Sequence, residues 1–296
     1  MLMATRAYKR KKPATGTTAI PFLITILISM IVIGAVGLYF YNRLTNKKAE
    51  LQPMQSATAS ISEEDINEIL FILKPDSENL QPAVMLMRFD PIRKDEYCVG
   101  IPLNLLVDND GREMTVEQCL TNHGANSLKN AIGNTLDQEI DRYILMNSAG
   151  FQKIIALIGN VSYVVTIRDN GLRPESTSQE LDATQFETLL SSRKYATEQE
   201  RSAVIGLSVA ALLNQCDGTR ISMNLDGYFS AFINTVTTDI TAMDFSDHRH
   251  AIAYIFEHAT APAKGVSLIY DQEESNLRIT QASVANLKVT FSQKAS

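Results

Sequence analysis

The longest apolar stretch of the chain lies close to its N-terminus. No charged side chain occurs within residues 20–42, and almost every position from Ala19 to Tyr41 is apolar. At about 1.5 Å per residue, a helix of this length spans a hydrocarbon layer of about 30 Å. We therefore predict one transmembrane helix over residues 20–42, with Tyr39, Phe40 and Tyr41 at the membrane interface.

The charges that flank this stretch predict its orientation. Residues 1–48 carry eight basic side chains and no acidic one, so the rest of the chain has a net charge of −14. Five of the basic residues precede the apolar run and three follow it. By the positive-inside rule, residues 1–19 form a cytoplasmic tail, and the body of the protein lies outside the membrane.

A cleaved signal peptide is the alternative to an uncleaved anchor, because Ala57-Thr58-Ala59 has the small-x-small form of a cleavage site. However, this site lies far beyond an apolar run that is itself longer than a typical signal-peptide core. We therefore interpret the run as a signal-anchor. Residues 43–62 are polar, small and Pro-containing, which predicts a flexible linker, and residues 63–296 form the extracytoplasmic domain.

The pattern in the domain alternates between strand-like and helical segments. Ser62 and the acidic residues after it are typical of a helix N-cap. Apolar runs separated by turn-rich segments predict the first strands, and a period of three to four residues then marks helices. The predicted strands are 68–73, 83–89, 97–103, 141–148 and 161–167; the predicted helices are 114–120, 125–140, 149–160, 182–190, 197–215 and 225–236.

The last segment, 264–292, again has a strand-like pattern. This order predicts an α/β domain with a mixed central sheet flanked by helices. The chain has only three cysteines, so a disulfide framework is excluded, and the sequence leaves open whether Cys98 and Cys119 form a bridge.

Other candidate sites are weak. His248 and His250 could form a metal site with Asp247, but a spacing of two separates them on a helix, which favours a solvated polar stretch. Residues 108–111, DNDG, lack the distant acid of a calcium loop and predict a turn. No G-x-S-x-G string indicates a hydrolase, and the acidic domain disfavours nucleic acid as a partner.

Several strings in order resemble the LytR-CpsA-Psr (LCP) family of bacterial cell-envelope proteins. The segment DRYILMNSAGFQKIIALIGNVSYVV, residues 141–165, is the most specific of them. The others are ILFILKPDSENL (69–80), VMLMRFDPIRKDEYCVGIPLN (84–104), SQELDATQFETLLSSRKY (178–195), EQERSAVIGLSVAALL (198–213) and VTTDIT (236–241). The resemblance covers residues 66–245, and the tail, membrane span and linker also match the family's architecture.

The resemblance implies a single-pass protein of the bacterial cell membrane with an extracellular LCP-like domain. In that family the domain binds a polyprenyl-pyrophosphate-linked glycopolymer with Mg²⁺, transfers the polymer to peptidoglycan, and holds the lipid tail in an apolar cavity. Arg side chains suit the pyrophosphate, and carboxylates suit the metal. The implied partners are the membrane, this lipid or glycopolymer, and envelope enzymes.

The residues that carry this chemistry are only partly present. Asp76 matches the first turn and is the candidate metal ligand, and Arg193 and Arg201 match two of the phosphate-binding positions. Other family charges are replaced at Glu78, Leu80, Pro82, Leu103, Asn104, Ser191 and Glu198. Each charge-assisted contact contributes about 1.5–3 kcal/mol, so these losses could remove most of a micromolar affinity.

Two roles remain open for Arg193 and Arg201: phosphate binding, or ion pairs with Glu187, Glu198 or Glu200 at helical spacing. The sequence favours an envelope protein that binds a polyprenyl-(pyro)phosphate lipid without efficient catalysis, a pseudoenzyme. The alternatives are an active glycopolymer phosphotransferase and a scaffold module that binds no ligand.

Overall fold

The computed structural model describes residues 61–292. The predicted cytoplasmic tail, the transmembrane helix and all but the last two residues of the linker lie outside this range. Within it, no helix combines the length and the apolar character needed to cross a membrane. Ser62 does precede a helical turn, η1 (Glu63–Asp65), and its backbone N–H donates to the Asp65 carboxylate at 2.9 Å.

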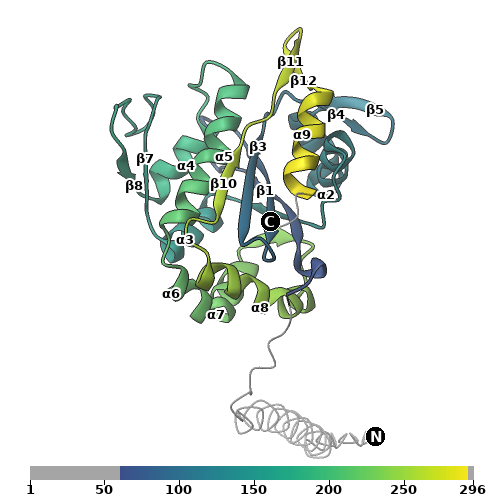
Figure 1. Ribbon diagram of the computed structural model, residues 1–296. Coiled ribbons are helices and arrows are strands. Elements are labelled where there is room, and N and C mark those ends of the chain that lie inside the picture. The colour runs from purple at the N-terminus through teal and green to yellow at the C-terminus, as the bar shows by residue number, and fades with distance from the viewer. Residues whose placement is uncertain (1–60, 293–296) are drawn as a thin grey trace, which may run out of the picture. The chain divides into compact units, whose positions relative to one another are not determined.

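A six-stranded mixed sheet forms the centre of the domain, as the sequence predicts (Figure 1). Its strand order is β10-β3-β2-β1-β6-β9, in which β1 runs parallel to β6, β3 runs parallel to β10, and the other neighbours are antiparallel. The strands are β1 (Asn67–Leu73), β2 (Ala83–Asp90), β3 (Asp95–Ile101), β6 (Arg142–Met146), β9 (Val236–Thr238) and β10 (Ala263–Val266).

Helices cover both faces of this sheet (Figure 1). One face packs against α2 (Val116–Leu136) and α9 (Gln281–Ser292). The other face packs against α3 (Ser148–Ile158), α4 (Ala183–Ser191) and α5 (Glu198–Gln215). At the end of the domain where β1 begins lie α6 (Gly218–Met223), α7 (Leu225–Ile233) and α8 (Ala242–His258).

Three small hairpins complete the described fold. DNDG is the predicted turn: Asp110 and Gly111, both with positive φ, join two short strands as a two-residue hairpin loop requires. The hairpins are β4 (Leu106–Asn109) with β5 (Arg112–Thr115), β7 (Val161–Tyr163) with β8 (Gln179–Leu181), and β11 (Tyr270–Glu273) with β12 (Asn276–Ile279).

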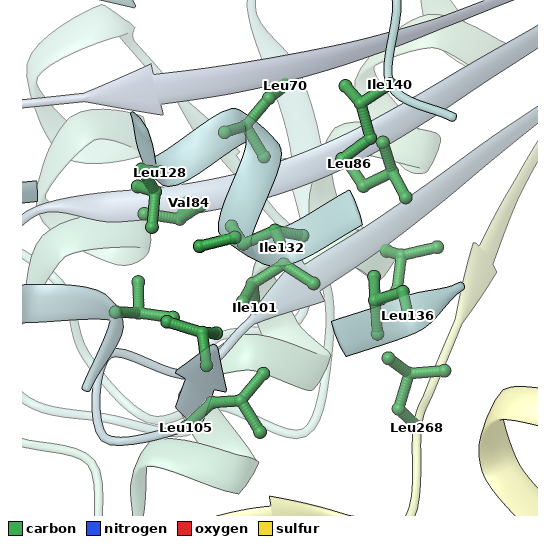
Figure 2. Packing of buried hydrophobic residues seen from close by; sticks show 14 of the residues in the cluster. Leu70, Val84, Leu86, Ile101, Leu105, Leu128, Ile132, Leu136, Ile140 and Leu268 are labelled. Atoms are coloured by element: carbon green, nitrogen blue, oxygen red, sulfur yellow. The ribbon is translucent and has the colours of Figure 1, made fainter. Parts of the chain in front are cut away.

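The core on the α2 face is densely filled. Leu70 on β1, Leu86 on β2 and Leu128 on α2 are fully buried and meet in one cluster, shown in Figure 2. Cys119 belongs to this cluster, whereas Cys98 belongs to the cluster on the opposite face of the sheet. The two thiols therefore cannot form a bridge, and all three cysteines are free.

Most predicted elements are present, with three differences. The prediction of strand-like structure over 264–292 is wrong for its second half, because Gln281–Ser292 forms α9, whose Leu287 and Phe291 pack into the core. The strand predicted over 161–167 ends at Tyr163. The two helical segments predicted around residue 124 form a single helix that is interrupted at Gly124, whose φ is 81°.

Glycine allows α5 to approach the sheet at backbone distance. A Cβ placed on Gly100 of β3 would lie 1.9 Å from the Ser202 carbonyl oxygen, so no larger residue fits there. Gly206 on α5 faces the Cys98 carbonyl in the same way. This contact fixes the first turn of α5, which carries Glu198 and Arg201, against the end of the sheet.

Candidate functional site

One face of the central strands borders a cavity rather than a filled core. In β1 the side chains of Leu70 and Ile72 are fully buried against α2, whereas Ile69 and Phe71, which point to the other face, are only partly buried. A cavity of about 380 Å³ lies in front of them. This volume falls within the range of about 300–1,000 Å³ that is typical of ligand pockets.

The cavity wall is almost entirely apolar. The sheet provides Ile69, Phe71 and Leu73 from β1 and matching residues from β2, and helices α3 to α8 enclose the space. Such a wall offers almost no hydrogen-bonding group and suits an aliphatic chain. The apolar cavity that the family resemblance implies is therefore present.

Charged groups in the described wall gather at one end of the cavity. Asp65 precedes β1, Arg142 opens β6, and Asp244 and His248 lie in the first half of α8. We call these four residues the charged rim. The Arg142 guanidinium donates two hydrogen bonds to the Asp244 carboxylate, at 2.7 and 3.3 Å, and this contact lowers the pKa of Asp244.

Two histidines meet the carboxylate of Asp65. His248 Nδ1 lies 3.6 Å and His250 Nε2 lies 3.7 Å from the same oxygen, distances too long for hydrogen bonds. Neither nitrogen has a hydrogen-bond partner among residues 61–292. The expectation that a spacing of two would separate these rings is wrong, because both rings face the same oxygen of Asp65. The acidic neighbour of the two histidines is therefore Asp65 and not Asp247.

The opposite end of the cavity is sealed by buried apolar side chains. We call this group of residues the closed end; it comprises Leu73, Ala83, Met146, Phe186 and Leu190. Each of these side chains is at most 7% exposed. None of the three candidates Asp76, Arg193 and Arg201 lines the cavity in the described structure. They instead lie around the loop that follows β1.

Asp76 lies in a separate, shallow polar hollow of about 400 Å³, lined also by Lys74, Asn147 and Thr237. The hollow shares only Met146 with the apolar cavity. The backbone N–H of Asp76 donates to Ser148 Oγ at 2.9 Å, and that hydroxyl donates in turn to the buried Glu187. Among the described residues, the carboxylate of Asp76 contacts neither Arg193 nor Arg201.

Arg201 is fully buried and has its hydrogen bonds satisfied inside the protein. Its guanidinium forms two bonds with the Glu198 carboxylate, at 2.7 and 3.0 Å. The same group donates to the carbonyl oxygens of Pro82 and Leu190, each at 3.0 Å. Of the two roles open for Arg201, the structure has the ion pair with Glu198.

Glu198 is fixed by more than this pair. Burial by itself would raise the pKa of Glu198, but the hydrogen bonds and charge of Arg201, together with the Leu103 N–H and the Gln81 amide, lower it below the usual range. The carboxylate is therefore ionised at neutral pH and cancels the charge of Arg201. Leu103 stands where the family resemblance implies an arginine, and Gln81 lies between Leu80 and Pro82, which replace an arginine and an aspartate of the family.

Arg193 is exposed and makes one contact, a hydrogen bond of 3.2 Å from its guanidinium to the Leu80 carbonyl oxygen. Arg193 and Arg201 therefore both contact residues 80–82. Arg193 approaches this segment from solvent, and Arg201 approaches it from the interior. Only Arg193 remains free to meet an anion.

The residues at the position implied for Mg²⁺ do not fit the ion. Asp76 is the one carboxylate of the family pattern that remains there, since Pro82 and Asn104 replace the other acids that the resemblance implies. The Asn104 amide donates instead to the Ser275 carbonyl. In the part of the chain that the structure describes, no three His, Cys, Asp or Glu residues are placed to share a metal.

Sequence reasoning missed Asp65, Arg142 and Asp244 as parts of a site. They come from segments far apart along the chain, and each has an ordinary local pattern. The acidic residues after Ser62 indicated that Asp65 lies at the start of a helix, but no local sequence pattern links Asp65 to α8.

Comparison with known proteins gives matches of structure but not of sequence. No protein-family model and no curated protein matches the chain. A protein from Eubacterium siraeum described as a transcription regulator has 18% sequence identity and a TM-score of 0.69, covering 80% of this chain and 96% of that one.

Bacillus subtilis TagV has 13% identity and a TM-score of 0.58, covering 79% of this chain and 98% of TagV. TagT, solved bound to LI-WTA, has 13% identity and a TM-score of 0.58, covering 78% of this chain and 92% of TagT. TagV and TagT are LCP family proteins. The chain therefore has the fold that its resemblance to this family implies.

Proposed function

We propose that this protein is a membrane-anchored, LCP-like protein of the bacterial cell envelope whose extracellular domain binds a polyprenyl-linked lipid without transferring its head group efficiently. The observation that carries the proposal is the apolar cavity of about 380 Å³ beside a fully neutralised Arg201. The cavity supports lipid binding, and the ion pair argues against the family's phosphate chemistry.

The cavity suits an isoprenoid chain on energetic grounds. Burial of apolar groups contributes about 0.8 kcal/mol per CH₂, so a few isoprene units supply a micromolar affinity of about 8 kcal/mol without any phosphate contact. The likeness to TagT, whose structure holds LI-WTA, supports a ligand of this class.

Weak transfer follows from the charges around Asp76. Glu78 stands where the family has an arginine, and Glu198 occupies the donors of Arg201 that would otherwise face a pyrophosphate. Of the two arginines, a pyrophosphate placed near this segment would meet only Arg193. An active glycopolymer phosphotransferase is therefore the less favoured function.

A role in transcription, given for the neighbour from Eubacterium siraeum, has no support from the charges of this chain. The sequence after residue 48 carries a net charge of −14, which repels nucleic acid. The apolar run over residues 20–42 and its basic flank instead support a single-pass membrane protein with the N-terminus in the cytoplasm.

Two assays on the full-length chain test the proposal. Equilibrium binding of radiolabelled polyprenyl phosphate should saturate at one lipid per chain. Incubation with polyprenyl-pyrophosphate-linked glycan, Mg²⁺ and peptidoglycan should give no transfer above the rate without protein. Binding without transfer supports the proposal; transfer at rates typical of enzymes would identify a phosphotransferase, and absence of binding would leave only the scaffold function.

A further inference from the structure

The two ends of the apolar cavity differ in a way that determines the orientation of a ligand. We infer, on the basis of the proposed lipid binding, that a single-chain isoprenoid amphiphile enters past the charged rim, with its polar head there and its chain directed towards the closed end. This places the head at the opposite end of the cavity from Asp76.

Arg201 contributes directly to sealing the closed end. Its guanidinium joins the Pro82 carbonyl, next to Ala83 of the closed end, to the Leu190 carbonyl of the closed end itself. It thereby links the start of β2 to α4, and its four hydrogen bonds within the protein and its full burial keep it from a ligand. A head group at this end would have to break buried hydrogen bonds of a charged group.

The charged rim provides what a polar head needs. Arg142 and His248 border the cavity there. Arg142 pairs with Asp244 and donates one bond to the Asp141 carbonyl, but unlike Arg201 it is partly exposed, and two of its five N–H groups remain for a phosphate or hydroxyl head. The closed end offers only buried apolar side chains.

The rim also lies at the end of the domain where the described part of the chain begins. Asp65 comes shortly after the linker, residues 43–62. At the same end of the domain, Met223 of α6 and Met243 of α8 are 75% and 74% exposed, the highest values for large apolar side chains among the described residues. Exposed apolar groups at this end of the domain suit transfer of a lipid from a bilayer.

The absence of Trp from the chain makes the orientation measurable. Phe89 pairs with Asn67 at the rim end of the sheet, and Phe151 lies against Phe186 at the closed end. Both line the cavity, so an indole ring has room to extend into it. The seven residues of β1 separate the two ends by about 20 Å at about 3.3 Å per residue.

The experiment measures Trp fluorescence of full-length Phe89→Trp and Phe151→Trp in amphipol. The probe is a polyprenyl phosphate with a nitroxide either on the head group or on the terminal isoprene. We expect the head label to quench Phe89→Trp several-fold more than Phe151→Trp, and the terminal label to give the reverse. Ile269→Trp, at an exposed site outside the cavity, controls for nonspecific quenching.

The outcomes separate this inference from the proposed function. The reversed pattern, or equal quenching of both variants by both labels, would overturn the orientation while leaving lipid binding intact. No quenching by either label, with no lipid retained in native mass spectrometry of the unsubstituted chain, would overturn both. Phe245→Trp at the rim and Phe186→Trp at the closed end form a second pair if either first variant does not fold.

Discussion

The carboxylate of Glu198 lies 2.7 Å from the guanidinium of the fully buried Arg201, one turn away on α5. The resemblance to the LCP family implies phosphate binding for this arginine, but its contacts in the structure are with the protein itself. Arg201 joins segments of the protein to one another instead of meeting a ligand.

Loss of Glu198 should therefore destabilise the fold. Glu198→Ala leaves a fully buried guanidinium without its counter-charge, which typically costs about 3–5 kcal/mol. Urea unfolding followed by circular dichroism should show this loss. The double variant Glu198→Leu with Arg201→Met, which removes both charges, should recover most of the stability; a loss below about 1 kcal/mol in the single variant would contradict the structural role.

Arg193 offers a matched contrast on the same segment. Because Arg193 is exposed and makes one hydrogen bond to the Leu80 carbonyl, Arg193→Ala should change the free energy of unfolding by no more than about 0.5 kcal/mol. Lipid retention should also stay unchanged, since Arg193 does not line the cavity. A tenfold loss of affinity for polyprenyl phosphate would instead assign this residue to the ligand.

Glu96 should make the stability depend on pH. Its side chain is fully buried on β3, and neither carboxylate oxygen has a hydrogen-bond partner among residues 61–292. Burial raises the pKa of Glu96 to about 8. Between the unfolded value of 4.5 and this value the native state holds more protons, so stability should fall as the pH rises, by up to about 1.4 kcal/mol per pH unit.

Urea unfolding at several pH values from 5 to 8, with Glu96→Gln as the comparison, tests this dependence. Burial also raises the pKa of Glu68 to about 7, against the effect of Arg88, and adds a slope of the same sign below that pH. The variant should therefore lose about half of the slope below pH 7 and most of it between pH 7 and 8. Glu64→Gln, at an exposed position, should leave the slope unchanged. An unchanged slope in Glu96→Gln would show that Glu96 is ionised in the native state.

Filling the cavity should weaken lipid binding while the fold persists. Ile69 faces the cavity from the middle of the sheet and is only partly buried, so Ile69→Trp places an indole in the space that the lipid needs. We expect the affinity for polyprenyl phosphate to fall more than tenfold in a fluorescence titration. Ile269→Trp makes the same change outside the cavity and should bind as the unsubstituted chain does.

Periodicity predicted the sheet and most helices because these patterns are local. It failed for α9, whose β-branched Val284, Val289 and Thr290 favour strands, while contacts of Leu287 and Phe291 with the distant core favour the helix. The strand order, by contrast, depends on which strands pair over long separations in the sequence. The sequence predicted only that the sheet is mixed.

The candidate site was only partly accessible from the sequence. Apolar residues such as Ile69 and Phe71 have the same pattern whether they face a filled core or a cavity, so the cavity came from the family resemblance and not from periodicity. The pairing of Arg201 with Glu198 could be foreseen as an alternative because the residues are three apart on a helix. Its bonds to Pro82 and Leu190 could not, because they join remote segments.

The most direct test of a lipid-binding domain without transfer is native mass spectrometry of the full-length chain after incubation with a polyprenyl-pyrophosphate-linked sugar and Mg²⁺. The structure predicts a single mass shift equal to one intact lipid-linked sugar per chain. A chain that carries no lipid, or one that carries only polyprenyl phosphate left after cleavage of the pyrophosphate, would contradict this account.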